Sequence, residues 1–124
     1  MATIKEFEDL EMWQDTRLFC NKIYIHVKDI KDYSFKDQIQ RASVSIMNNI
    51  AEGFERSSDA DFCKFLVIAK SSAGEVRSML YLAGDFSYIT IEKRDELIQD
   101  CKKIAIKIKK LITYLQSNIK TIKH

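Results

Sequence analysis

Apolar side chains recur every three or four residues along most of the chain, which is the spacing that lines one face of an α-helix. The predicted helices run over about residues 9–30, 35–56, 59–84 and 90–117. Four amphipathic helices with connections of about three to five residues form an up-down-up-down antiparallel bundle. The absence of proline and the presence of only three glycines also favour long helices with few turns. We therefore predict an all-α four-helix bundle with a single domain over residues 1–124.

Short polar stretches mark the predicted helix ends. Ser34 and Ser58 are placed as N-caps of the second and third helices, and Thr90 opens the fourth. Beyond Ser117 the fourth helix is expected to fray. The apolar lines predicted to form the core of the first, third and fourth helices contain Trp13, Thr16, Cys20, Ile23, Val27 and Ile30, then Phe62, Phe65 or Leu66, Ala69, Ala73, Val76, Leu80 and Ala83, and then Leu97, Cys101, Ile104, Ile108, Leu111 and Leu115.

The second predicted helix has an unusually broad apolar surface. One line of this surface contains Phe35, Ile39, Ala42, Ile46 and Ile50, and the other contains Val44, Met47, Ala51 and Phe54. Together they cover about half of the circumference, more than the ~100° stripe that packing on one core requires. We therefore expect a homo-oligomer. Its interface, with another copy or with a partner, is predicted to contain Arg41, Val44, Met47, Asn48, Ala51, Glu52 and Arg56.

Two further features of this helix concern its neighbours. Gly53 continues the line of Ile39, Ile46 and Ile50, so another helix is expected to pass close to it. A polar stripe at spacings of four, three and four residues has two interpretations. It could bind a polar ligand or partner helix, or it could form ion pairs between helices and subunits while Asn49 fixes their register. The stripe contains Arg41, Ser45, Asn48 and Glu52.

Composition narrows the class of protein. No apolar run is long enough to cross a membrane, and the acidic N-terminal stretch has no apolar signal core. The three cysteines are widely spaced and fall on or beside apolar lines, which is typical of buried thiols in a reducing compartment. They are Cys20, Cys63 and Cys101. We therefore expect a cytoplasmic protein that has no membrane partner.

The charge is distributed unevenly. Residues 1–100 hold 13 Lys and Arg against 18 Asp and Glu, whereas residues 101–124 hold seven lysines and no acid. This basic segment could be a solvated helix face, or it could contact RNA or DNA phosphates without sequence specificity. The lysines predicted to form this nucleic-acid-binding face are Lys102, Lys103, Lys107, Lys109 and Lys110.

Residues that would support catalysis are not grouped along the sequence. There is no Ser/His/Asp set, no phosphate-binding glycine loop and no close Cys/His spacing of a zinc site. We therefore expect no enzymatic activity, no cofactor and no metal site.

Three blocks of the sequence carry a family resemblance. The first runs from Phe7 to Trp13, and the others contain Arg41, Ala42, Ser45, Ile46, Asn49, Ile50, Ala51, Glu52 and Gly53, then Phe62, Phe65, Leu66, Ala69, Ser72 and Glu75. Together they resemble the bacterial four-helix-bundle family of 23S rRNA intervening-sequence proteins. The chain departs from that pattern at Met47, where the family usually has proline.

The resemblance has implications for assembly and partners. The family is related in fold to the accessory protein of diversity-generating retroelements, which forms a pentameric ring and works with a reverse transcriptase and nucleic acid. The resemblance thus implies a homopentameric ring acting near RNA or DNA, with a nucleic-acid-processing protein as a further partner. From this we expect a non-enzymatic accessory or scaffold protein, with a protein–protein adaptor as the alternative.

Overall fold

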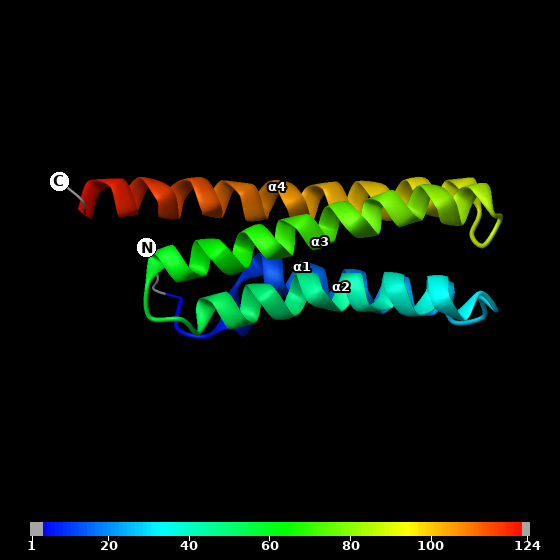
Figure 1. Cartoon of the computed structure of the whole chain (residues 1–124), viewed down its shortest axis with the longest axis horizontal. Helices are drawn as coiled ribbons and strands as arrows, with labels where there is room; N and C mark the ends of the chain where they lie inside the picture. Colours follow the sequence, from blue (N-terminus) through cyan, green and yellow to red (C-terminus); the bar gives the residue numbers. More distant parts are fainter. Residues whose placement is uncertain (1–3, 123–124) are drawn as a thin grey trace.

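The structure is a computed structural model that describes residues 4–122. Its elements are a short 3-10 helix, η1 (Phe7–Asp9), and the α-helices α1 (Glu11–Val27), α2 (Tyr33–Phe54), α3 (Asp59–Asp85) and α4 (Ile91–Ile122). These four long helices alternate in direction, and each packs on the next while α4 also packs on α1 (Figure 1). The described part of the chain contains no β-strand. It is therefore the all-α four-helix bundle that the apolar pattern predicted.

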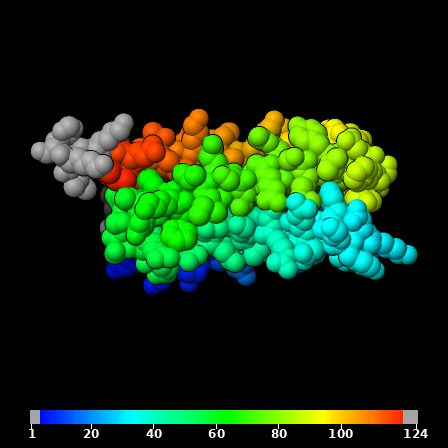
Figure 2. Space-filling model, in the orientation of Figure 1, coloured from blue at the N-terminus to red at the C-terminus, as the bar shows by residue number. Residues whose placement is uncertain are grey.

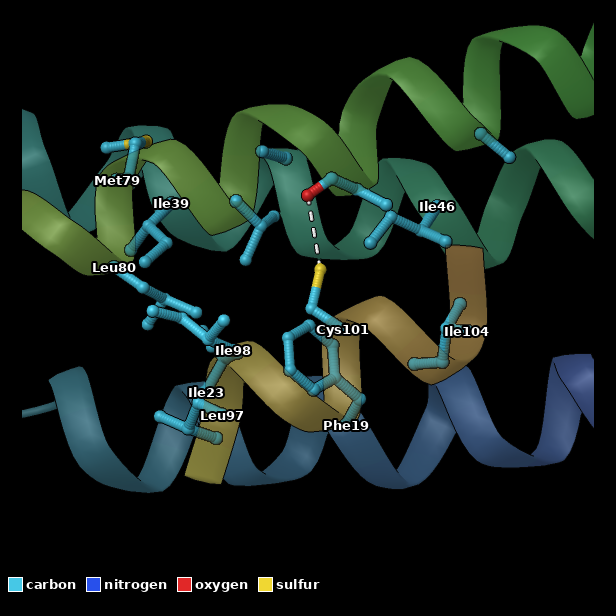
Figure 3. Close-up of a cluster of buried hydrophobic side chains, with 14 of the residues drawn as sticks. Phe19, Ile23, Ile39, Ile46, Met79, Leu80, Leu97, Ile98, Cys101 and Ile104 are labelled. Atoms are coloured by element: carbon cyan, nitrogen blue, oxygen red, sulfur yellow. Dashed lines mark hydrogen bonds between the residues drawn. The ribbon is translucent and has the colours of Figure 1, made fainter. Parts of the chain in front are cut away.

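The core is built from the predicted apolar lines of all four helices (Figure 3). Ile23, Ile46, Leu80 and Ile108 are completely buried, one from each helix. Burying a side chain of this size stabilises the fold by about 1.5–3 kcal/mol relative to leaving it in water. The predicted lines are confirmed except at their margins, where Trp13, Phe62, Phe65 and Leu111 are only partly buried.

Helices α2 and α3 approach each other closely at Gly53, as the sequence predicted. A Cβ atom on Gly53 would lie 2.8 Å from Phe65 Cβ and 2.9 Å from Phe62 Cδ1. Further along the same contact, the Ser45 and Ser72 hydroxyls lie 2.9 Å apart. Small residues on both helices, Gly53 and Ser45 on α2 and Ser72 on α3, therefore allow the two backbones to pack closely.

The helix boundaries differ from the predicted ones at three places. Helix α2 is capped by Asp32 rather than Ser34, because the Asp32 carboxylate accepts a hydrogen bond from the Phe35 N–H at 3.2 Å. Helix α1 ends at Val27, although Ile30 is buried beyond its end. Helix α4 continues past Ser117 to Ile122, because Ile119 still packs against the core. The predicted Ser58 cap of α3 is confirmed, because the Ser58 hydroxyl accepts a hydrogen bond from the Asp61 N–H.

The loops between α1 and α2 and between α3 and α4 meet at one end of the bundle. The Tyr88 hydroxyl donates a hydrogen bond to the Asp32 carboxylate at 2.8 Å, and the Tyr88 ring packs edge-on against Phe35. The same aspartate therefore caps α2 and ties the two loops together. Within the described residues, no helix combines the length and apolar character needed to span a bilayer.

Candidate functional site

The five lysines of α4 predicted to contact nucleic acid are spread around the helix, and Lys107 already has partners on α1. Lys107 donates to the carboxylates of Glu11 and Asp15 on α1. The hydrogen bond with Asp15, followed by that with Glu11, raises the pKa of the Lys107 ammonium group above its ordinary value. The charge of Lys107 is thus already balanced within the bundle, and it is the least available of the five lysines to a phosphate.

Lys103 and Lys110 lie on the same side of α4 as Lys107 and line a groove between α1 and α4. The groove has a volume of about 510 Å³. Phe19 and Ile104 are buried at its floor, whereas Leu18 and Ile106 expose 64% and 54% of their surface at its walls. The remaining lining residues are Asp15, Lys22, Asp100, Lys103, Lys107 and Lys110. We call this surface the α1/α4 groove.

The charges in the α1/α4 groove are partly paired. Lys22 contacts Asp100 at 2.9 Å, and Lys107 neutralises Asp15. Lys103 and Lys110 form no ion pair with the described residues. The groove therefore combines an apolar interior with two available positive charges.

Lys109 lies on another side of α4, where it faces α3. There it lines a hollow of about 300 Å³ that also contains Lys70 of α3 and no acidic residue. The other lining residues are Val67, Ser71, Ile112, Thr113 and Gln116. Lys102 is also exposed, and none of these three lysines forms an ion pair with the described residues. We call this surface the α3/α4 hollow.

The predicted interface residues of α2 lie on its outward surface. Val44, Met47 and Ala51 are partly exposed, so the chain itself does not fully cover the second apolar line. The charged and amide members of the set, Arg41, Asn48, Glu52 and Arg56, are exposed. Figure 2 shows the face of the molecule over which α2 and α3 run side by side.

The polar stripe of α2 divides into two parts. Asn49 donates to the backbone oxygen of Ser45 at 2.8 Å, and Ser45 meets Ser72 of α3. This part joins two helices of one chain, in line with a role in their register. Arg41 pairs instead with Asp37 at 2.7 Å, within the same helix.

Arg56 likewise pairs with Glu52 at 3.4 Å, four residues earlier in the chain. The ion pairs that the sequence suggested between helices of one chain are therefore not formed by Arg41, Glu52 and Arg56. Exposed pairs four residues apart contribute only about 0.3–0.5 kcal/mol each. These pairs do not by themselves order the face, and its charged groups remain at the surface.

The cysteines lie where the apolar lines predicted. All three are free thiols and buried. Burial raises the pKa values of Cys20 and Cys101 to about 11, so both are protonated at neutral pH. The Cys101 thiol donates to the backbone oxygen of Ala73 at 3.1 Å (Figure 3). These groups are packed as small apolar residues and are not poised as nucleophiles.

Histidine, cysteine and acidic side chains do not converge on a metal position. Among the described residues, no group of three or more of them could hold a metal ion. Among the hollows that the described residues form, the α1/α4 groove and the α3/α4 hollow both combine lysines with apolar side chains. Each surface can bind a partner through apolar contacts and through the positive charge of its lysines.

The residues that the sequence interpretation missed are the ones that α4 meets across the bundle. Leu18, Ile106 and Lys70 were not selected, although Leu18 and Ile106 are apolar residues outside the predicted core lines. Apolar residues outside the core lines were the sequence feature that could have indicated the groove. Nothing in the sequence places Lys70 near Lys109, because they lie 39 positions apart and on different helices.

The comparisons with known proteins agree on one family. A family model described as "23S rRNA-intervening sequence protein" matches residues 8–110. A crystal structure from Bacteroides thetaiotaomicron, described as a protein of unknown function from the S23 ribosomal protein family, is 30% identical in sequence. It superposes with a TM-score of 0.77 over 82% of this chain and 97% of that chain. No functionally curated protein matches the chain.

Proposed function

Because this chain belongs to the 23S rRNA-intervening sequence protein family, we propose that it is a non-enzymatic scaffold that self-assembles and contacts nucleic-acid phosphates through the α3/α4 hollow. The proposal rests on one observation. Lys70 and Lys109 line the same hollow, and no acidic residue lines it. Lys102 adds a third charge on the same helix as Lys109. Phosphate binding by such lysines is independent of base sequence and releases counterions.

Self-assembly is supported by the apolar surface that the chain leaves uncovered. Leu18, Ile25 and Ile106 expose 64%, 61% and 54% of their surface, and several other large apolar side chains are about half exposed. Leu18 and Ile106 line the same groove, and contiguous exposed apolar surface commonly marks protein contacts. We propose a closed homo-oligomer, with the pentamer as the expected size. Repetition of the hollow around such an assembly would multiply weak phosphate contacts.

The α1/α4 groove favours a second candidate function. Its exposed Leu18 and Ile106 suit a protein partner better than a phosphate backbone. In this alternative the chain is a protein–protein adaptor, and the lysines of the hollow are only solvated. A nucleic-acid-processing protein is a partner that both candidate functions accommodate, and we expect the scaffold to work in the cytoplasm.

The test compares two double variants that remove the same charge from different places. Lys70→Gln with Lys109→Gln alters the hollow, whereas Lys28→Gln with Lys31→Gln alters exposed lysines of the loop after α1. Binding to a fluorescent single-stranded RNA and to a DNA duplex of matched sequence is measured by anisotropy over a range of salt concentrations. Each phosphate contact that is lost should lower the salt slope by about 0.7–0.9.

We expect the hollow variant to lose most of its affinity for RNA and DNA alike, and the loop variant to bind as the parent does. Equal losses in the two variants would show that only net charge matters. If the parent binds neither nucleic acid at low salt, the phosphate proposal is wrong and the adaptor function is favoured.

A further inference from the structure

Two unlike apolar surfaces lie on opposite sides of the bundle. The first is the α1/α4 groove. The second is formed by Ile68, Glu75 and Leu82, which recur every seven residues along α3 and which we call the α3 ridge. Ile68 and Leu82 expose 47% and 44% of their surface. Because the helices pack in the order α1, α2, α3, α4 around the bundle, the α2/α3 side lies opposite the α1/α4 side.

Glu75 places the α3 ridge on the α2/α3 side of the molecule. Its carboxylate accepts a hydrogen bond from the Gln38 amide of α2 at 3.4 Å. Figure 2 views this face, with α2 and α3 running along it. At 1.5 Å per residue, Ile68 and Leu82 lie about 21 Å apart with Glu75 midway between them. The ridge therefore presents two apolar side chains separated by one acid.

The charges of the two surfaces are complementary. Glu75 forms no ion pair with the described residues, and neither does Lys103 or Lys110 in the groove. The acids of the groove already have partners, since Asp100 contacts Lys22 and Asp15 contacts Lys107. The unpaired groups are thus negative on the ridge and positive in the groove, with exposed apolar side chains beside both.

We propose that the α3 ridge of one copy packs into the α1/α4 groove of a second copy, with Glu75 beside Lys103 and Lys110. This inference rests on the self-assembly in the proposed function and names the surfaces that achieve it. A contact between two different surfaces is heterologous, and such contacts form a ring when the rotation between copies closes. The α3/α4 hollow shares no lining residue with the α3 ridge or the α1/α4 groove, although its Lys109 borders Ile106 and Lys110 of the groove.

The proposal replaces the α2-centred interface with one that uses α3 and the groove. The α2 residues expected from the sequence are partly or fully exposed, and this contact does not require them. Exposed apolar side chains on both partners leave water together, which is the main driving force of association. The central Glu75 fixes orientation, because a shift along the groove would separate it from the lysines.

The experiment uses one variant of each surface and their mixture. Ile106→Glu places an acid in the groove against Glu75, and Leu82→Lys places a base on the ridge against Lys103 and Lys110. Both positions are exposed, so far-ultraviolet circular dichroism should show an unchanged helix content. The control, Tyr33→Glu, changes a side chain that is 69% exposed and belongs to neither surface. Masses are measured by size exclusion with light scattering at one protein concentration.

We expect the parent and the control to be oligomers and each surface variant to be a monomer. An equal mixture of the two variants should form a dimer and nothing larger. The dimer pairs the intact ridge of the Ile106→Glu subunit with the intact groove of the Leu82→Lys subunit, which leaves only altered surfaces free. Leu18→Glu and Ile68→Lys repeat the test at a second position of each surface.

The outcomes separate this inference from the proposed function. A surface variant that assembles like the parent would overturn the ridge-in-groove contact while leaving self-assembly intact. Variants that are monomeric alone and remain monomeric when mixed would also overturn it, because a heterologous contact must be restored by complementation. A monomeric parent would overturn self-assembly, and this inference with it. The nucleic-acid binding measurement stands apart from all three results.

Discussion

The close contact at Gly53 gives a sharp prediction about stability. In Gly53→Ala, the new methyl group would lie 2.8 Å from Phe65 Cβ and 3.3 Å from the Phe62 backbone oxygen. Carbon atoms in favourable contact are about 3.5–4.0 Å apart. Phe65 Cβ is attached directly to the backbone of α3, so a side-chain rotation cannot relieve the overlap. Helices α2 and α3 must therefore separate locally.

The size of the effect follows from two opposing contributions. Replacing glycine by alanine inside a helix stabilises it by about 1 kcal/mol, whereas overpacking a core contact costs about 1–3 kcal/mol. Gly74→Ala is the matched control, because a Cβ atom there meets no neighbour within 4 Å. In Gly74→Ala the free energy of unfolding should rise by up to about 1 kcal/mol. The difference between the two variants, about 1–3 kcal/mol, then isolates the cost of the α2–α3 contact.

Urea unfolding followed by circular dichroism measures both variants at the same protein concentrations, because self-association changes apparent stability. We expect Gly53→Ala to unfold at a lower urea concentration than Gly74→Ala, with a similar slope of the unfolding free energy against urea. Gly53→Leu should unfold at a still lower urea concentration. Equal midpoints for the two alanine variants would refute the reasoning. They would mean that α3 does not pass close to Gly53.

Two further predictions concern α4. Lys107→Gln should lower the free energy of unfolding by at most about 1 kcal/mol, because Lys107 is partly exposed and salt screens its pairs with α1. The contribution of Lys107 is fully present below the pKa of lysine in the unfolded chain and is lost as pH rises through the raised folded pKa, so the two proteins should converge in strongly alkaline urea titrations. Cys20 and Cys101, with pKa values of about 11, should resist a thiol reagent in the native protein at mildly alkaline pH and react after unfolding. Rapid labelling of both before unfolding would contradict their burial.

The sequence alone determined which residues form the core and where most helices begin. Ile39, Ile46 and Ile50 are buried as their spacing predicted, because a helix places every third or fourth residue on one side regardless of what it meets. The cap at Thr90 is confirmed by the N–H of Lys93 at 3.1 Å. A cap depends on atoms within a few residues, so local sequence carries that information. Gly53 was found for the same reason, since it continues an apolar line.

The tertiary structure alone decided which charged groups are available. The sequence places Lys103, Lys107 and Lys110 on one side of a helix, but it does not say that Glu11 and Asp15 of α1 lie opposite Lys107. Those acids precede Lys107 by more than 90 positions, and only the packing of α1 on α4 brings them together. Periodicity fixes the direction of a side chain about its own helix. The neighbour that it meets depends on how the helices pack, and this also decides whether a lysine is paired or free to bind a partner.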